Sequence, residues 1–353
     1  MYLTGISLQN FRNYQQQSFL FPRATTVIVG DNGVGKTSLL EAISLLATGE
    51  SFRAERVEEM IRFGTEIARV KGKVLEEEGH FTELEITLTR GVLNGQKVQS
   101  RLYAVNNVRR LKKNFIGHLF AVVFRPEDMR LIEGSPGRRR DFIDTLLSVT
   151  DRDYAQSLKT YGDGLVRRNR LLTQIRENEM PRSALTYWTT LLLKHGQVLQ
   201  EKRRQLLGFF ASVEFPFQFS AAYQPSVISE ARLAQYAENE VAAGHTLVGP
   251  HKDDFMVNLA SDSEGLALHL FGSRGQQRLG VLWLKMCELA YLKNQTGLQP
   301  LLLLDDILSE LDQAHRQAVL SLLNHGQAVI TTTEMRMVEE ISAVAQDFEI
   351  LHI

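Results

Sequence analysis

Apolar residues in the first part of the chain follow patterns that predict strands around one helix. Residues 26–29 form a β-branched run of the buried-strand type, and apolar residues recur at helical spacing from about 39 to 47. Residues 81–88 alternate between apolar and polar side chains, and the Asn94-Gly95 pair is a strong signal for a hairpin turn. We therefore expect an antiparallel meander of strands over residues 66–108.

The pattern becomes helical at about residue 141. Apolar side chains then recur at spacings of three, four and seven as far as about residue 210, with a break at Pro181. This spacing predicts a helical hairpin whose arms are each at most ~30 residues, or ~45 Å, long. Apolar strand patterns flank the hairpin on both sides, at residues 121–124, 257–259, 266–270, 301–304, 329–331 and 348–353.

These patterns predict an α/β fold built from three stretches of the chain. We expect residues 1–140 and 246–353 to form one lobe with an antiparallel β subdomain, and residues 141–245 to form an inserted helical lobe. The composition, 44% hydrophobic and 23% charged, excludes collagen-like and mostly disordered chains. The single cysteine, Cys287, excludes an intrachain disulfide, and we interpret it as a buried apolar side chain. The chain shows neither a secretory signal nor an apolar run of membrane-spanning length, so we expect a cytoplasmic protein that has no membrane partner.

A phosphate-binding loop follows the first apolar run. The sequence from Gly30 to Thr37, GDNGVGKT, matches G-x-x-x-x-G-K-[ST] between a predicted strand and a predicted helix. In such a loop, backbone N–H groups and the helix N-terminus hold phosphate oxygens, Lys36 reaches the β- and γ-phosphates, and the Thr37 hydroxyl is a ligand of Mg²⁺. The alternative is a glycine turn that only allows close strand–helix packing. The expected nucleotide contacts are Gly30, Asp31, Asn32, Gly33, Val34, Gly35, Lys36, Thr37 and Ser38.

Two carboxylates follow a second apolar strand. The run 301–304 is four leucines, typical of an interior parallel strand, and it is followed directly by Asp305 and Asp306. At the carboxyl end of such a strand, Asp305 is expected to hold Mg²⁺ and Asp306 to act as the general base that polarises the attacking water. The alternative is an acid pair that caps the next helix.

Two further segments resemble motifs of ABC-type ATPases. Ser273–Arg278 (SRGQQR) resembles the signature motif, in which Ser273, Gly275 and Gln276 would contact the γ-phosphate bound by a second subunit. Residues 309–312 (SELD) resemble the D-loop, with Ser309 and Asp312 as its key positions. The resemblance implies a homodimer that forms when ATP completes each half-site. The alternative for the first segment is a plain helix N-cap.

Other segments make the resemblance more specific. Residues 10–13 (NFRN), 125–129 (RPEDM), 134–144 (GSPGRRRDFID), 248–254 (VGPHKDD) and 304–312 (LDDILSELD) are similar to segments of the RecF family of bacterial recombination mediators. The match runs from residue 3 to about 335. It implies an ABC/SMC-head-like P-loop ATPase lobe, ATP and Mg²⁺ as cofactors, binding to the double-stranded part of a single-strand/double-strand DNA junction, and nucleoid association. It also implies RecR as a direct partner, RecO and RecA as indirect ones, and roles in recombination, replication restart and the SOS response.

The sequence departs from transporter-type ABC ATPases at two positions. Asp306 stands where transporters use a glutamate, and Thr331–Thr333 stand where they carry a histidine near the γ-phosphate. A shorter base holds water less closely, so we expect a slow, DNA-stimulated ATPase that acts as a switch.

Basic residues are concentrated in one region of an otherwise mildly acidic chain. The net charge is −1, but residues 101–140 hold ten Lys/Arg and three acids, which is +7. Phosphate contact needs only cationic side chains along a groove. The candidates are Arg109, Arg110, Lys112, Lys113, Arg138, Arg139 and Arg140, with Arg167, Arg168, Arg170, Lys202, Arg203 and Arg204 on the helical lobe. Structural ion pairing is the alternative for the run 138–140, and a solvated helix face is the alternative for the run 202–204.

Three smaller assignments have two readings each. Arg12 and Asn13 either border the nucleotide pocket or form a strand-end turn. His251, Asp253 and Asp254 are either metal ligands or part of a hydrogen-bonded loop, and the absence of further Cys or His nearby favours the loop. For the whole chain, the alternatives are an ABC-type ATPase subunit of another complex, including a membrane transporter, and a nuclease coupled to an ABC-like head.

Overall fold

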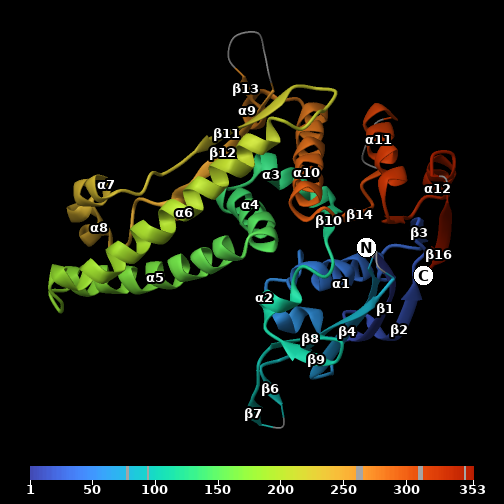
Figure 1. The fold of residues 1–353 in the computed structure, drawn as a ribbon, viewed down its shortest axis with the longest axis horizontal. Helices are drawn as coiled ribbons and strands as arrows, with labels where there is room; N and C mark the ends of the chain where they lie inside the picture. Colours follow the sequence, from blue (N-terminus) through green and yellow to red (C-terminus); the bar gives the residue numbers. More distant parts are fainter. Residues whose placement is uncertain (77–78, 94, 260–264, 309–312, 346) are drawn as a thin grey trace. The chain divides into compact units, whose positions relative to one another are not determined.

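The chain folds into two compact units (Figure 1). The computed structural model describes residues 1–353 apart from 77–78, 94, 260–264, 309–312 and 346. Unit 1 contains residues 1–128 and 288–353, and unit 2 contains residues 129–287. Residues 129–140 and 246–287, which we expected in the lobe of the P-loop, therefore belong to the unit that contains the long helices.

An antiparallel sheet forms the N-terminal part of unit 1. Its strand order is β2-β1-β4-β5-β8-β9, and every neighbouring pair is antiparallel, as the meander prediction requires. Apolar side chains alternate along β4 and β5, so that one face of the sheet is buried. The strands are β1 (Tyr2–Phe11), β2 (Tyr14–Leu20), β4 (Ile67–Leu75), β5 (Phe81–Thr89), β8 (Arg101–Val105) and β9 (Val108–Arg110).

A parallel sheet completes unit 1. Its order is β10-β14-β15-β3-β16, and all four neighbouring pairs are parallel. The three central strands are buried along their whole length, which explains why they read as continuous apolar runs. The strands are β3 (Thr25–Val29), β10 (Ala121–Phe124), β14 (Leu301–Asp305), β15 (Ala328–Thr332) and β16 (Phe348–His352).

Helix α1 (Lys36–Thr48) packs between the two sheets. It contacts β1, β4 and β5 of the antiparallel sheet and β10, β14 and β15 of the parallel sheet. Its residues 38–47 are all buried and belong with both sheets to one core. Gly72 of β4 allows the closest approach, because a Cβ there would lie 2.5 Å from a methyl group of Leu46. The helix that starts at the P-loop is therefore the centre of unit 1.

The remaining elements of unit 1 are short. The pair β6 (Val92–Leu93) and β7 (Gln96–Lys97) forms the predicted hairpin, although Asn94 itself lies outside the described residues. The helical segments are η1 (Val57–Met60), α2 (Lys112–Phe115), α11 (Gln313–Leu320), η6 (Ser321–His325) and α12 (Met335–Ser342). The segment η2 (Pro126–Met129) lies at the change from unit 1 to unit 2.

Unit 2 contains the predicted helical hairpin and a small sheet. The arms are α5 (Arg152–Arg176) and α6 (Thr186–Phe210), each of 25 residues, which lie against each other, and α4 (Pro136–Thr150) contacts both. The sheet order is β11-β12-β13. Its strands are β11 (Phe219–Gln224), β12 (Asp254–Leu259) and β13 (Leu266–Ala267), and the shorter helices are α3 (Arg130–Glu133), η3 (Arg182–Leu185), α7 (Glu230–Gln235), α8 (Ala237–Ala243) and η4 (Pro250–Lys252).

One predicted strand is wrong. The alternating run 266–270 forms only the two residues of β13, and the chain then turns into α9 (Leu268–Phe271), where Leu268 is buried and Leu270 is exposed. Short apolar runs do not distinguish strand from helix. The long helix α10 (Arg274–Thr296) follows, with Cys287 fully buried as expected. Among the described residues, no helix combines the length and the apolar character that crossing a bilayer requires.

Candidate nucleotide-binding site

The P-loop lies at the carboxyl end of β3, where the chain turns into α1. Gly35 has a φ of +124°, and a Cβ at this position would lie 2.7 Å from Nδ2 of Asn13 and 2.8 Å from the hydroxyl of Tyr14. Only glycine satisfies both the left-handed backbone and the close contact. Asn13 and Tyr14 donate hydrogen bonds to the carbonyls of Val34 (2.7 Å) and Gly35 (3.1 Å), so the start of β2 supports the loop.

Lys36 is held over the loop that precedes it. Its Nζ donates hydrogen bonds to the carbonyl oxygens of Gly30, at 2.7 Å, and Asp31, at 2.9 Å. The side chain is buried although it is charged. Two carbonyl acceptors fix the ammonium group at the mouth of the loop, where a phosphate oxygen would meet it together with the backbone N–H groups at the start of α1.

Asp305, the first of the two predicted carboxylates, contacts the end of the P-loop from another strand of the parallel sheet. Asp305 ends β14, and β15 separates β14 from β3. Its Oδ1 accepts hydrogen bonds from the hydroxyls of Thr37 and Thr331, both at 2.9 Å. Burial raises the pKa of the Asp305 carboxyl, while these two hydrogen bonds act to lower it. The fold therefore joins the two residues expected at a magnesium ion, Thr37 and Asp305.

Asp306 follows in a strained backbone conformation. Its φ is +51°, which is uncommon for any residue except glycine, asparagine and aspartate. Its N–H donates a hydrogen bond to the hydroxyl of Thr331 at 3.1 Å. Thr331 therefore orients both aspartates, a role that the sequence did not indicate for it. Non-glycine residues in this conformation cluster at functional sites.

A cleft of about 690 Å³ opens at the P-loop. It is lined by loop residues, by Asp305, Asp306 and Thr331, and by Arg12 and Asn13, which thus border the pocket rather than only forming a turn. A nucleoside triphosphate fits a cleft of this size. The other lining residues are Asn32, Gly33, Gly35, Lys36, Thr37, Ser38, Arg53, Glu58, Glu59, Ile61, Phe63 and Arg90.

A buried ion pair fixes Arg12 at the edge of this cleft. Its Nε and Nη2 each lie 2.7 Å from a carboxylate oxygen of Glu41 on α1, and its Nη1 donates to the carbonyl of Glu59. Glu41 is fully buried. We did not identify Glu41 from the sequence; a charged residue at an otherwise apolar helix position was the signal available.

The donor set fits the magnesium ion that the sequence implies. A hydroxyl and a carboxylate are the hard oxygen ligands that Mg²⁺ takes alongside phosphate oxygens and water. Thr37 and Asp305 place such oxygens in hydrogen-bonding contact beside Lys36. The described residues hold no cluster of three or more His, Cys, Asp or Glu side chains arranged for a metal.

In unit 2, the predicted signature residues form a reciprocal helix cap at the start of α10. The N–H of Gln276 donates to Oγ of Ser273 at 3.3 Å, and the N–H of Ser273 donates to Oε1 of Gln276 at 2.9 Å. This is a capping box. Gly275 lies in the first turn, where an added Cβ would meet only Oγ of Ser273, at 4.0 Å. The helix N-cap alternative is therefore correct for this segment. The cap leaves Ser273 at the surface, at the N-terminus of the helix. The predicted D-loop residues Ser309 and Asp312 lie outside the described residues.

Three predicted DNA contacts are not available for phosphate binding. Arg139, Arg168 and Arg203 are buried and bind carboxylates: Arg139 pairs with Asp254, Arg168 with Glu240, and Arg203 with Asp144 and Asp253. The ion-pair alternative therefore holds for Arg139. Arg168 and Arg203 are also ion-paired, so Arg203 does not lie on a solvated helix face. Arg140 is partly exposed and donates to the carbonyl of Asp253.

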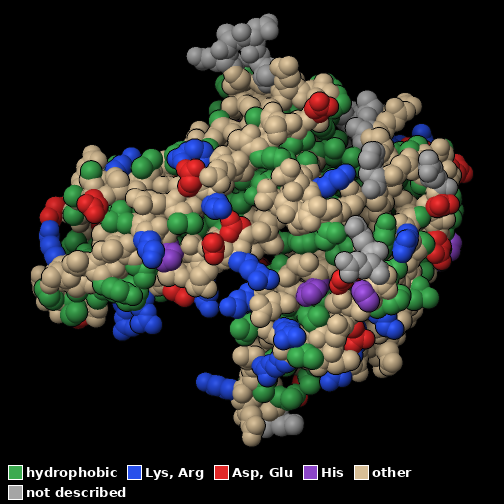
Figure 2. Space-filling view, viewed as in Figure 1, with side chains coloured by type: hydrophobic (Ala, Val, Ile, Leu, Met, Phe, Trp, Pro, Cys, Tyr) green, Lys and Arg blue, Asp and Glu red, His purple; other side chains and the backbone are tan. Residues whose placement is uncertain are grey.

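The other basic candidates lie at the surface. Figure 2 shows Lys and Arg side chains over the part of unit 1 formed by β6–β9. Arg109 and Lys112 make polar contacts with Gln99 and Glu50, and neither contact buries the side chain. The exposed candidates are Arg109, Arg110, Lys113, Arg138, Arg167, Arg170 and Arg204, while Lys112 and Lys202 are partly exposed.

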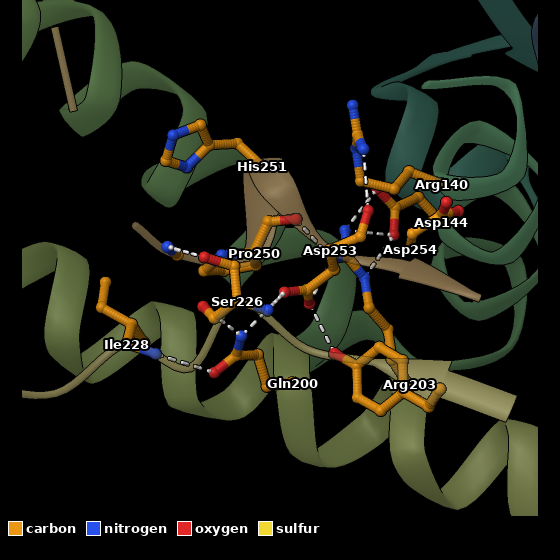
Figure 3. A network of polar contacts seen from close by, with 12 residues as sticks. Arg140, Asp144, Gln200, Arg203, Ser226, Ile228, Pro250, His251, Asp253 and Asp254 are labelled. Atoms are coloured by element: carbon orange, nitrogen blue, oxygen red, sulfur yellow. Dashed lines mark hydrogen bonds and ion pairs between the residues drawn. The ribbon is translucent and has the colours of Figure 1, made fainter. Parts of the chain in front are cut away.

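The segment 248–254 takes part in a polar network and does not form a metal site (Figure 3). Asp253 accepts hydrogen bonds from Gln200, from the N–H of Ser226 and from Arg203. His251 accepts at Nδ1 from the hydroxyl of Tyr161 (2.8 Å) and donates from Nε2 to the carbonyl of Thr246 (3.1 Å), because a carbonyl only accepts. The hydrogen-bonded-loop alternative is therefore correct for these residues.

The fold and the site together define an ABC- and SMC-head-like P-loop protein. The model of the RecF/RecN/SMC N-terminal domain matches residues 2–349. The chain belongs to the RecF family within this class. A Moorella thermoacetica protein, DNA replication and repair protein RecF, is 36% identical over 94% of this chain and 90% of its own length. Its namesake from Gloeobacter violaceus is 35% identical over 96% and 93%.

Solved structures agree with this assignment. A structure of the recombination mediator protein RecF with ATP, in the RecFOR pathway, has a TM-score of 0.84 and 30% identity, and covers 94% of this chain and 92% of that one. The Smc head domain of Pyrococcus furiosus, with 17% identity and a TM-score of 0.53, shares the fold.

Proposed function

We propose that this chain is an ATP-dependent DNA-repair protein whose P-loop binds ATP with Mg²⁺. The observation that carries the proposal is the arrangement of Lys36, Thr37 and Asp305 at the carboxyl ends of parallel strands, beside a cleft large enough for a nucleotide. The similarity to RecF with bound ATP supports the same assignment. Bound Mg²⁺ would neutralise charge on the phosphates, and Thr37 and Asp305 would hold it.

Hydrolysis would be slow in this site. Asp306 is the candidate general base, with its backbone fixed by the hydrogen bond of its N–H to Thr331. Its side chain is one methylene shorter than the glutamate of transporters, so water would be held less closely. Lys36 would stabilise charge on the transferred phosphoryl group. Such a site suits a switch whose bound and hydrolysed states differ in partner affinity.

The second half of the site would come from another copy of the chain. One chain carries one P-loop and one signature-like helix start, with Ser273 exposed and Gly275 and Gln276 partly exposed at the N-terminus of α10. A helix N-terminus binds phosphate through its N–H groups and its dipole. ATP bound to one protomer would therefore recruit the helix of the other, and ATP would drive homodimer formation.

The macromolecule that this protein would bind is DNA. The exposed cations Arg109, Arg110 and Lys113 on unit 1, with Arg138 on unit 2, are the candidates for phosphate contact. The RecF relatives are named for DNA replication and repair, and the RecFOR pathway supports RecR, and through it RecO and RecA, as further partners. Binding to the double-stranded part of a gapped junction, loading of RecA and nucleoid association belong to the same proposal.

One pair of titrations tests the proposal. Sedimentation velocity and DNA-binding anisotropy are measured with and without Mg-ATP, on the wild type and on Lys36→Arg, using gapped and fully single-stranded DNA. We expect ATP-dependent dimers and tighter binding to the gapped DNA, both reduced in the variant. A wild type that stays monomeric with saturating ATP and ignores DNA would point instead to an ATPase subunit of another complex.

A further inference from the structure

A tight turn presents an aromatic side chain to the nucleotide cleft. Residues 62–65 form a β-turn closed by the hydrogen bond from the N–H of Thr65 to the carbonyl of Arg62, at 3.1 Å. Gly64, the third residue of the turn, has a φ of +80°, which a type II turn requires of that position. Phe63 is the second residue, at the corner of the turn.

The turn is fixed to the strand end that supports the P-loop. The N–H of Arg62 donates to the carbonyl of Asn10, and its guanidinium contacts the carbonyl of Asn13. Ile61 is buried and forms a β-bridge with Phe11. On the other side, Nε of Arg90 donates to the carbonyl of Thr65 at 2.9 Å. These contacts come from two separate segments, residues 10–13 and Arg90, so the turn is preorganised.

The ring at this corner has no place in the protein core. The side chain of Phe63 is 98% exposed, the highest value among the large apolar residues that the structure describes, and it lines the same cleft as Lys36, Thr37 and Asp305. Because the ring of Phe63 buries almost no surface, it adds nothing to the stability of the fold. It suits an apolar, flat ligand group that reaches this wall while charged groups bind the P-loop.

We propose that Phe63 is the platform on which the base of the bound nucleotide stacks. This inference rests on the proposed function, since it concerns the nucleotide bound at Lys36. An aromatic ring stacks on the face of any base, and removing such a ring weakens binding by about 5- to 150-fold. The platform would therefore add affinity for nucleotides over inorganic phosphate chains without selecting strongly between adenine and guanine. Phe63 is a positioning and affinity residue here, and it takes no part in hydrolysis.

The test compares ligands with and without a base. Binding of Mg-ATP, Mg-GTP and Mg-tripolyphosphate is measured by calorimetry on the wild type, Phe63→Ala and Lys36→Ala. We expect Phe63→Ala to weaken ATP and GTP by a similar factor of about 5 to 150 and to leave tripolyphosphate unchanged. Phe81→Ala is the matched control, because Phe81 is also exposed but does not line the cleft; it should change none of the three.

A second variant gives a readout that does not depend on affinity. Phe63→Trp should keep ATP binding, and its emission should be quenched by ATP and not by tripolyphosphate, after subtraction of the signal from the two native tryptophans. If Lys36→Ala abolishes binding while Phe63→Ala leaves ATP affinity unchanged, the base platform is wrong and the nucleotide site stands. If Lys36→Ala has no effect on any ligand, the proposed function itself is wrong. A Phe63→Ala protein that binds ATP normally but loses DNA or dimer affinity also overturns the platform.

Discussion

The hydroxyl of Thr37 donates a hydrogen bond to Oδ1 of Asp305 at 2.9 Å, although 268 residues separate them in the chain. Thr37 lies in the first turn of α1 and Asp305 ends β14, so this contact exists only when the helix and the parallel sheet are both in place. It joins the two side chains that we assign to the magnesium ion. Each is therefore positioned before a nucleotide binds, which lowers the ordering cost of binding.

Thr37→Val tests this contact. Valine keeps the shape of threonine but removes the hydroxyl, so the variant loses both the bond to Asp305 and one expected metal ligand. We expect Mg-dependent ATP affinity to fall more than tenfold in calorimetry. Thr37→Ser, which keeps the hydroxyl, should fall much less. Equal affinity of the valine variant and the wild type would remove Thr37 from the site.

Asp305→Asn should separate stability from function. Burial raises the pKa of this carboxyl, so the folded protein at neutral pH keeps a desolvated charge that the unfolded chain solvates freely. Asparagine can still accept the bonds from Thr37 and Thr331 through its Oδ1. We expect the variant to melt at a higher temperature at pH 7 and to bind Mg-ATP at least tenfold more weakly.

The sign of this effect can be checked by pH. Because the pKa of Asp305 is raised in the folded protein, lowering the pH toward it protonates the carboxyl and removes the buried charge of the wild type. The difference in melting temperature between the wild type and Asp305→Asn should therefore shrink as the pH falls. A variant that melts lower than the wild type at pH 7 would contradict the assigned direction.

Two adjacent arginines of α6 should differ sharply in their effect on stability. Arg203 is 2% exposed and holds the carboxylates of Asp144 and Asp253 at 2.8 and 3.0 Å, whereas Arg204 is exposed and pairs with Glu201. Removing one partner of a buried ion pair costs about 3–5 kcal/mol, and an exposed pair contributes about 0–1 kcal/mol. We expect Arg203→Met to lower the free energy of unfolding in urea by the larger amount and Arg204→Met to be nearly neutral.

Burial of His251 should make unit 2 sensitive to acid. Burial lowers the pKa of His251 from 6.5 to about 4, although the hydrogen bond to the carbonyl of Thr246 acts to raise it. The unfolded chain takes up a proton near pH 6.5 and the folded one only near pH 4. The free energy of unfolding should therefore fall as the pH drops through this window, by at most about 3 kcal/mol.

The matched comparison for this residue is His251→Gln, which keeps a donor and an acceptor but does not titrate. Unfolding of both proteins is followed at pH 7, 6 and 5, near α5 and α6, by hydrogen exchange. The wild type should lose stability faster than the variant as the pH falls. Parallel pH profiles would show that His251 does not control this response.

Ser273→Asp tests the role of the α10 start in dimer formation. Aspartate is as good an N-cap as serine, so the capping box with Gln276 should persist. A carboxylate at this position would repel the phosphate of a nucleotide on a second protomer. We expect unchanged ATP binding by the monomer and loss of the ATP-dependent dimer in sedimentation. A variant that dimerises like the wild type would exclude Ser273 from the interface.

The sequence was sufficient where a motif is contiguous. The loop from Gly30 to Thr37 and the acid pair at 305–306 have local patterns, and the structure places them together at one sheet edge. Glu41 and Tyr14 could not be identified in this way, because each acts through a contact with a distant segment. Phe63 could not be identified because only the folded chain places it at the cleft. No local pattern marks an aromatic residue as exposed in a cleft.

The misread parts have equally specific causes. The run 266–270 alternates like a strand, but it is too short for its period to decide, and the burial of Leu268 fixes it as a helix. Arg139, Arg168 and Arg203 look like surface cations in the sequence because their partners, Asp254, Glu240 and Asp144, lie 59 to 115 residues away in the chain. Buried ion pairs are a property of the folded chain and leave no mark in local composition.

The position of α1 has a consequence for how unit 1 comes apart. Residues 38–47 of α1 are buried between the two sheets, so this part of the helix has no solvent-exposed face from which it can begin to unfold. Backbone amides of β1 and β4 and those of β14 and β15 are then protected by the same structural event, and none of these strands can open alone. Occupation of the phosphate loop would slow proteolysis far from it, in strands that never touch a nucleotide.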